Sequence, residues 1–210
     1  MRDVYIVGED DATRAVIERI IADYNPNLNI LQSLPARGSQ IKAMMSRFNT
    51  LATRNPVILL TDLDDDPCAP IGKQKLLAGM VQSHDFILNI AYDEVEAWLM
   101  ADTDGFSTYF SIPKKEMPAF TLQKMQGRKA LSEISLDVKS SWHLTHRLSH
   151  RSTNSTVKDQ ISVPIDEPAC KGKEYNSAIV PFVRNAWNPE AARQVSDSLN
   201  RMILRIQNLC

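Results

Sequence analysis

The stretch from Val57 to Asp66 constrains the fold of this chain more than any other part of it. It reads VILLTDLDDD, so five uncharged residues, three of them β-branched, precede four aspartates within five positions. An apolar run of this length, ended by polar residues, is typical of a strand buried inside a parallel sheet. The aspartates then follow the carboxyl end of that strand, where open α/β sheets bind their ligands.

The sequence on either side of this stretch alternates between the patterns of strands and helices. Strands are predicted at residues 4–7, 28–34, 57–61 and 86–91, and helices at about 12–25, 39–54, 71–82 and 93–100. The first two helices are predicted from apolar residues that recur at three- and four-residue steps, and the third from its place after the proline turn at residues 67–70. Four such repeats predict the α/β class, with a mainly parallel sheet of about four strands flanked by helices and joined by right-handed crossovers. This core is expected to span residues 1–105.

The second half of the chain has a less regular pattern. Residues 103–122 are predicted to be a loop with short helical pieces, 128–150 a helix, 151–174 a linker, and 175–187 and 189–207 two helices. The linker is inferred from its Ser, Thr and Pro content. We therefore expect residues 106–210 to form a basic, mainly helical extension packed on the core.

Charge is distributed unevenly between the two halves of the chain. The formal net charge is −1, yet residues 1–105 contain 9 Lys and Arg against 16 Asp and Glu, whereas residues 106–210 contain 15 against 9. An acidic half joined to a basic half is expected when the first binds a cation and the second contacts a polyanion such as nucleic acid. A chance division with internal salt bridges explains the same counts, so charge alone does not decide between the two.

Other patterns limit the class of protein. No apolar run approaches the roughly 18 residues of a membrane span, and the N-terminus lacks a signal-peptide pattern, so we expect a soluble, cytoplasmic protein without membrane contact. The three cysteines are widely spaced and form no CxxC pair, which indicates neither a disulfide framework nor a zinc knuckle. The GxxxxGK[ST] phosphate loop is absent from the sequence, so ATP hydrolysis would require a partner protein.

Acidic residues directly follow three of the predicted strands. The three acidic groups lie at residues 9–11, 62–66 and 93–96. Because the carboxyl ends of parallel strands lie at one edge of a sheet, we expect these groups to converge. Two carboxylates about 4 Å apart repel by about 4 kcal/mol at an effective dielectric constant near 20, a repulsion that Mg²⁺ or Mn²⁺ would offset. The alternative is that the acidic residues cap helices and mark turns.

The order of these acidic residues resembles a known family. A Glu after the first strand (Glu9), an Asp-x-Asp after a later strand (Asp62 and Asp64) and a Glu-x-Glu-Ala-Trp-Leu-x-Ala-Asp block from Glu94 to Asp102 together resemble the Toprim fold. The last block is most similar to small bacterial Toprim-like proteins related to the nuclease part of the OLD (overcoming lysogenization defect) family. The resemblance covers residues 3–105 and extends loosely to residues 172–176.

The resemblance implies roles for the matching residues. The expected metal ligands are Glu9, Asp62, Asp64, Glu94 and Glu96. The expected catalytic residues are Glu9, Asp62, Asp64, Glu96 and Lys173. Among these, Glu9 is also the expected general base, and Lys173 matches the basic residue that stabilises the phosphate in OLD-type nucleases. The metals implied are Mg²⁺ or Mn²⁺.

One position departs from the family pattern. Toprim proteins of this type often carry an acidic residue four positions after the first Glu, where this chain has Thr13. Asp10 or Asp11 is the alternative ligand. The departure leaves open whether the site holds one metal ion or two.

Basic residues of the second half are candidates for nucleic-acid contact. The predicted contact residues are Lys139, His146, Arg147, Arg151, Lys171 and Lys173. His143, His146 and His150 are spaced three and four apart and would share one helix face, where zinc binding or an ordinary solvated face are the alternatives to phosphate contact.

These observations lead to three hypotheses for function. The first is a divalent-metal-dependent nuclease that hydrolyses phosphodiester bonds of DNA or RNA, working with a separate ATPase in an anti-phage defence system, as the resemblance implies. The second is a non-catalytic Toprim-like subunit that binds nucleic acid or regulates a partner. The third is phosphoryl transfer with Asp62 or Asp64 as the nucleophile, although no lysine is found where that chemistry expects one within the predicted sheet. The sequence leaves the oligomeric state open, a homo-oligomer included.

Overall fold

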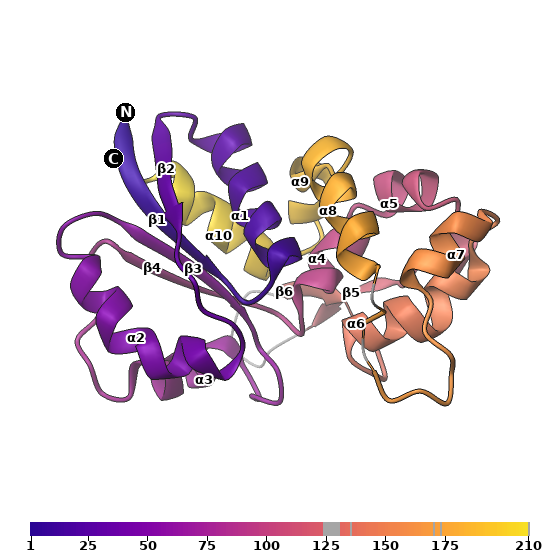
Figure 1. The fold of residues 1–210 in the computed structure, drawn as a ribbon, viewed down its shortest axis with the longest axis horizontal. Coiled ribbons are helices and arrows are strands. Elements are labelled where there is room, and N and C mark those ends of the chain that lie inside the picture. The colour runs from indigo at the N-terminus through magenta and orange to yellow at the C-terminus, as the bar shows by residue number, and fades with distance from the viewer. Residues whose placement is uncertain (124–130, 135, 170, 173, 210) are drawn as a thin grey trace. The chain divides into compact units, whose positions relative to one another are not determined.

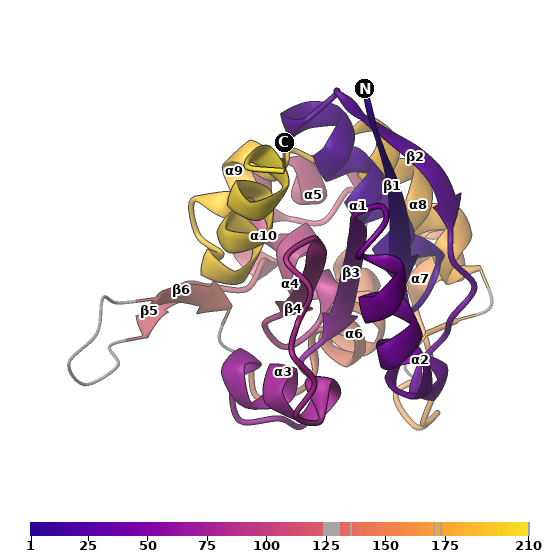
Figure 2. The same ribbon diagram turned by 90° about the vertical axis from the view of Figure 1, so that its left-hand side faces the viewer.

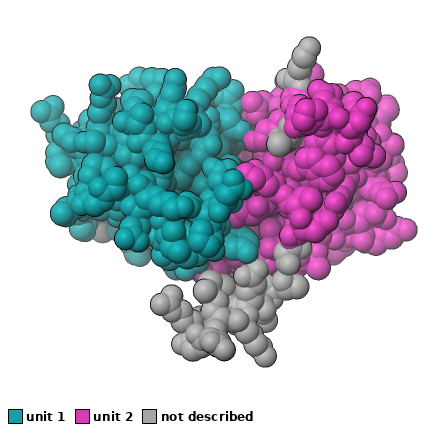
Figure 3. All heavy atoms as spheres, turned by 90° about the horizontal axis from the view of Figure 1, so that it is seen from below, with its two compact units in different colours: residues 1–92, 201–210 teal, residues 93–200 magenta. Residues whose placement is uncertain are grey.

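The computed structural model describes residues 1–210 except 124–130, 135, 170, 173 and 210. Contacts between residues divide the chain into two compact units, which Figure 3 shows in different colours. Unit 1 consists of residues 1–92 and 201–210, and unit 2 of residues 93–200. The boundary at residue 105 that the sequence suggests stays a prediction.

Unit 1 contains a sheet of four parallel strands. The strands are β1 (Arg2–Gly8), β2 (Leu28–Ser33), β3 (Val57–Asp62) and β4 (Phe86–Ala91). Their order across the sheet is β2-β1-β3-β4, and every pair is parallel. The α/β class and the parallel sheet flanked by helices are therefore confirmed. Because β2 lies on one side of β1 and β3 on the other, the strand order reverses between β1 and β3, which is the switch point where such sheets bind ligands.

Helices cover both faces of this sheet, as Figure 1 and Figure 2 show. The connecting helices are α1 (Asp11–Tyr24), α2 (Ser39–Leu51) and α3 (Ala69–Leu77). Ile41, Met45 and Phe48 of α2 pack in one cluster with Val57 and Leu59 of β3. Val57, Ile58, Leu59 and Leu60 all have 0% exposure, because alternate residues of β3 face helices on opposite sides of the sheet. Burial on both faces explains the uninterrupted apolar run that opens the β3 stretch.

The ends of the helices in unit 1 follow local chemistry. Asp10 caps α1, since its carboxylate accepts a hydrogen bond from the backbone N–H of Thr13 at 2.8 Å. Helix α3 was expected at residues 71–82 but spans Ala69–Leu77. It ends there because Ala78 and Gly79 adopt left-handed backbone angles, with φ values of 46° and 81°. Left-handed residues commonly end helices, and glycine adopts this conformation without strain.

Unit 2 is mainly helical. Its helices are α4 (Val95–Ala101), α5 (Thr103–Tyr109), α6 (Ser140–His143), α7 (Ser155–Ile161), α8 (Tyr175–Asn185), α9 (Pro189–Arg193) and the start of α10 (Asp197–Gln207). Short 3-10 or π turns lie at Lys114–Glu116, Leu144–Leu148 and Ser149–Arg151. Phe106, Phe110 and Phe182 pack together, with ring centroids 4.5 to 5.3 Å apart. The predicted helical C-terminus is confirmed.

Three predictions for the second half were wrong in detail. Residues 131–134, expected within a helix, form β6 (Leu131–Ile134), which pairs antiparallel with β5 (Phe120–Gln123). The predicted linker at 151–174 contains α7, whose first turn is capped by Asn154. The predicted helix at 189–207 is divided into α9 and α10. Among the described residues, no helix is long and apolar enough to cross a membrane.

Glu133 of β6 explains the start of α10. Its carboxylate is 3% exposed and accepts hydrogen bonds from the backbone N–H of Ser198 at 2.6 Å and from the hydroxyl of Ser196 at 2.9 Å. The first N–H groups of a helix have no partner within the helix, so an acceptor supplied from another strand favours a new helix start here.

The burial of Glu133 predicts a specific pH dependence of stability. Desolvation raises the pKa of this carboxyl, although the hydrogen bonds from Ser198 and Ser196 oppose the shift. The folded chain therefore keeps a proton at a pH where the unfolded chain, with a glutamate pKa of about 4.3, has released it. The resulting stabilisation is fully present below the unfolded-state pKa and is lost as the pH rises through the raised folded-state pKa. Over this range the free energy of unfolding falls by at most about 1.4 kcal/mol per pH unit.

Urea denaturation at a series of pH values checks this expectation. Glu133→Gln should remove this part of the pH dependence, because the amide does not titrate. Glu190→Gln, at an exposed position of α9, is the matched control and should follow the wild-type curve. The same pH profile for Glu133→Gln and the wild type would contradict the assignment.

Candidate functional site

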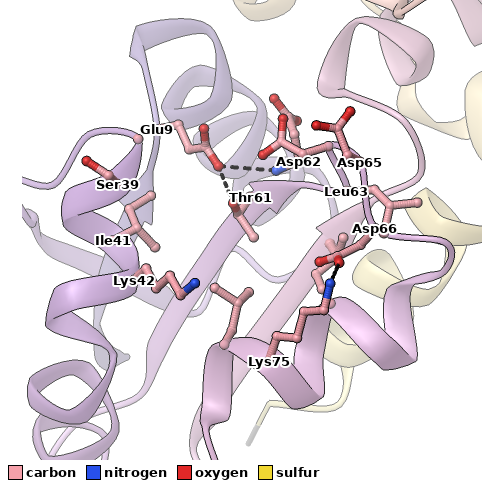
Figure 4. A pocket seen from close by; sticks show the side chains of 15 residues that line it. Glu9, Ser39, Ile41, Lys42, Thr61, Asp62, Leu63, Asp65, Asp66 and Lys75 are labelled. Carbon is pink, nitrogen blue, oxygen red and sulfur yellow. Dashed lines mark hydrogen bonds and ion pairs between the residues drawn. The ribbon is translucent and has the colours of Figure 1, made fainter.

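A pocket of about 510 Å³ opens at the carboxyl edge of the sheet in unit 1 (Figure 4). Its lining combines residues that follow β1 and β3 with residues of α2 and α3, so it lies at the switch point of the strand order. Its five carboxylates belong to Glu9, Asp62, Asp64, Asp65 and Asp66. The structure therefore brings Glu9, from the first acidic group predicted from the sequence, together with the second group. Asp10 instead caps α1, and Asp11 pairs with Arg14.

Glu9 joins the ends of β1 and β3. It directly follows Gly8, the last residue of β1, which lies opposite Leu60 of β3. The Glu9 carboxylate accepts hydrogen bonds from the hydroxyl of Thr61 and from the backbone N–H of Asp62, the latter at 3.3 Å. These contacts hold the Glu9 carboxylate beside the position where Asp62 begins the acidic run.

The acidic run from Asp62 to Asp66 turns sharply after β3. Asp64 has a φ of 52°, a left-handed conformation that Asp tolerates better than most residues. Leu63 is only 6% exposed and anchors the loop between two aspartates. In Figure 4 the carboxylates of Asp62 and Asp65 point to the same side of the loop, whereas Asp66 points toward Lys75. The turn thus places the carboxylates of Asp62 and Asp65 on one side and that of Asp66 beside Lys75.

Two lysines of the pocket were missed in the sequence. Lys42 of α2 and Lys75 of α3 line the same pocket as the carboxylates. The ammonium group of Lys75 forms an ion pair with Asp66. Neither lysine belongs to a sequence motif. Helices of an α/β sheet begin near the carboxyl edge of the sheet, and Lys42 lies one turn after Gly38, so the predicted start of this helix was the one available signal for Lys42.

The third acidic group belongs to unit 2 and has its own neighbours there. Glu94 precedes α4 and accepts a hydrogen bond from the backbone N–H of Ser141 at 2.6 Å. Burial, followed by the nearby charge of Glu96, raises the pKa of the Glu94 carboxyl. Glu96 is 2% exposed and accepts hydrogen bonds from the hydroxyl of Tyr175 at 2.7 Å and from the ammonium of Lys171 at 2.8 Å.

Among the predicted nucleic-acid contacts, His146 is enclosed by protein. It is 2% exposed, its ring stacks on Trp142 with centroids 4.4 Å apart, and its Nε2 lies 3.0 Å from the carbonyl oxygen of Glu167. Lys139 precedes α6 and is half-buried. Lys173 lies outside the described residues.

The two arginines of the predicted contact set are exposed. Arg147 forms a bidentate ion pair with Asp137, at 2.6 and 3.0 Å, and its guanidinium lies 5.0 Å from the ring centroid of Trp142. Arg151 lies 3.7 Å from Glu116. Both guanidiniums are therefore at the surface of unit 2 with acidic neighbours.

The lining of the acidic pocket fits a hard divalent cation in its chemistry. Among the described residues, no group of three or more His, Cys, Asp or Glu side chains is arranged to hold a metal ion by itself. The histidines considered for zinc are included in this statement. Mg²⁺ is usually held by only one or two carboxylates together with water and substrate phosphate. The carboxylates of Asp62, at the end of β3, and of Glu9, beside it, are oxygen ligands of the kind that Mg²⁺ binds.

Comparison of the chain with protein families, with curated proteins and with solved structures gives no match. The Toprim resemblance is therefore carried by the motif residues alone.

Proposed function

We propose that this protein is a Toprim-like, Mg²⁺- or Mn²⁺-dependent nuclease that hydrolyses phosphodiester bonds of DNA or RNA. The observation that carries the proposal is the meeting of Glu9 and Asp62 at the switch point of the sheet, in a pocket that also contains Asp64 and two lysines. A pocket with acidic and basic groups suits a ligand pair of opposite charges, namely a cation and a phosphate.

The electrostatics of the pocket favour a cation. Carboxylates about 4 Å apart repel by about 4 kcal/mol at an effective dielectric constant near 20, and a bound divalent ion offsets that repulsion. In this proposal one or two of the carboxylates of Glu9, Asp62 and Asp64 contact the ion directly and the rest act through its bound water. The resemblance adds Glu94 and Glu96 for a second ion. A divalent ion bound here supplies an activated water and stabilises charge on the phosphodiester oxygens.

The other pocket residues have defined tasks in the proposal. Thr61 donates its hydroxyl to Glu9 and so fixes the orientation of that carboxylate. The ammonium groups of Lys42 and Lys75 offset part of the phosphate charge, since Lys acts as a compact point charge toward phosphate. Asp66 holds Lys75 and thereby limits its movement.

The partners proposed are nucleic acid and a separate ATPase, in an anti-phage defence system. Support for nucleic acid comes from the basic second half of the sequence and from the exposed Arg147 and Arg151. The ATPase is inferred from the resemblance, because OLD-type nucleases couple their Toprim domain to an ATPase and this sequence contains no GxxxxGK[ST] loop.

Incubation of the purified protein with plasmid, single-stranded DNA and tRNA tests the proposal. Cleavage is expected with Mn²⁺ or Mg²⁺ and none with EDTA, since the carboxylates alone stabilise little charge on the phosphate. Cleavage that persists in EDTA would refute the metal requirement.

Two outcomes of the same experiment would favour the other functions. Nucleic-acid binding without cleavage under any metal condition would favour a non-catalytic subunit. A covalent phospho-aspartate at Asp62, formed from a small phosphoryl donor, would favour phosphoryl transfer, for which Lys42 and Lys75 supply the lysines that the sequence pattern lacked.

A further inference from the structure

A second pocket lies at the same edge of unit 1 and has the opposite charge. It has a volume of about 320 Å³ and is lined by Arg14, Ser33, Arg37 and Gln40 together with three apolar residues. In this part of the chain, which is described throughout, the lining contains no Asp or Glu. The acidic pocket, in contrast, is lined by five carboxylates.

The basic pocket is a neighbour of the acidic one by the order of the chain. Ser33 ends β2, which pairs with β1, and Arg14 lies in the first turn of α1 directly after β1. Gly38 and Ser39 line the acidic pocket, whereas Arg37 and Gln40, on either side of them, line the basic one. The two pockets therefore lie on opposite sides of the start of α2.

Two donors of the basic pocket lack a partner among the residues that the structure describes. The Nε of Arg14 and the hydroxyl of Ser33 are buried, and neither has a hydrogen-bond partner among the described residues. Buried polar groups without partners are rare in proteins, and binding of an ion is one of the explanations for them. Arg14 is positioned by its ion pair with Asp11 at 2.6 Å, which uses Nη1 and leaves Nε for another acceptor.

The remaining groups also favour an anion. The side-chain oxygen of Gln40 accepts the backbone N–H of Arg37 at 3.2 Å, so the carboxamide of Gln40 has its NH₂ group available as a donor. Helix α2 begins at Ser39 without a side-chain cap, and its positive end adds to the field of the two arginines. Arginine forks match phosphate oxygens in geometry and charge.

We propose that the basic pocket binds one phosphate group of the nucleic-acid strand, next to the phosphodiester that occupies the acidic pocket. The identification of the ligand as a nucleic-acid strand rests on the proposed function. The presence of a phosphate site does not depend on it. Bound in this way, the strand crosses the start of α2 and is held at the bond to be hydrolysed and at one neighbouring phosphate. A phosphate thus fixes the register of the strand without reading its sequence.

Calorimetric titration with inorganic phosphate in EDTA tests the site without metal or catalysis. The wild type should bind phosphate, and Arg37→Gln should weaken binding about tenfold, the effect of one hydrogen bond to a charged group. Arg47→Gln is the matched control, because Arg47 is an exposed arginine of α2, the helix that follows Arg37, and lines neither pocket. Phosphate should also shift the NMR signal of the Arg14 Nε–H group.

Three outcomes separate this inference from the proposed nuclease. Absence of phosphate binding, or equal affinity in the wild type and Arg37→Gln, would overturn the site. Phosphate that a thymidine oligonucleotide fails to displace would overturn the assignment to a nucleic-acid strand. Displacement of phosphate by the oligonucleotide in a protein that cleaves nothing with any metal would support the phosphate site and refute the nuclease. Asp64→Asn, in the acidic pocket, should leave the affinity of the basic pocket for phosphate unchanged.

Discussion

Asp62→Asn is expected to lower metal-dependent cleavage at least about 100-fold, which corresponds to about 2.7 kcal/mol of transition-state stabilisation. The substitution keeps the size of the side chain and removes the negative charge at the end of β3, beside Glu9. A neutral amide binds a divalent ion much more weakly than a carboxylate does, so higher Mn²⁺ concentrations should restore part of the activity. Initial cleavage rates across a metal titration give both quantities.

Two control variants make this result specific. Asp65→Asn changes the same acidic run and the same pocket, but Asp65 is not one of the proposed ligands of the ion, so cleavage should stay within about threefold of the wild type. Asp23→Asn removes only a surface ion pair with Arg19 on α1. Equal losses in Asp62→Asn and Asp65→Asn would contradict the ligand assignment, and urea denaturation of all three variants excludes unfolding as the cause.

The sheet of unit 1 was predictable because its signals are local. The strand at Val57–Asp62 begins as an apolar run, and the helices that join the strands have local signals, such as the Asp10 cap of α1 and the proline in the first turn of α3. Parallel pairing follows from the strand–helix alternation, so the meeting of Glu9 with Asp62 was predictable as well. Local patterns do not tell which helix residues line a pocket, and Lys42 and Lys75 were missed for this reason.

The errors in the second half arise from contacts between residues far apart in sequence. The helix expected across residues 189–207 begins anew at α10, where Glu133 supplies an acceptor to the N–H of Ser198, 65 residues away along the chain. The strand that carries Glu133 is itself defined by antiparallel pairing with β5. Propensity within a short window is a weak guide where pairing and burial of this kind decide the structure.

Glu96→Ala is expected to destabilise the folded chain by about 2–4 kcal/mol. The Glu96 carboxylate is 2% exposed, and its loss leaves the Tyr175 hydroxyl buried without the acceptor that lies 2.7 Å away. Lys171 also loses its ion pair with Glu96, but its side chain is 32% exposed and reaches water, so the cost is below that of a fully buried pair. The ring of Tyr175 lies 5.1 Å from the Lys171 ammonium and keeps part of its favourable contact.

Urea denaturation of Glu96→Ala, Glu96→Gln and Tyr175→Phe apportions this cost. Glu96→Gln retains an acceptor for the Tyr175 hydroxyl, and Tyr175→Phe leaves Glu96 paired with Lys171, so each should cost about 1 kcal/mol. A loss below about 0.5 kcal/mol in Glu96→Ala would contradict the structural role. Because Glu96→Gln nearly preserves stability, a cleavage loss in that variant as large as in Asp62→Asn would assign Glu96 to the chemistry, whereas wild-type cleavage would restrict it to holding Tyr175 and Lys171 in place.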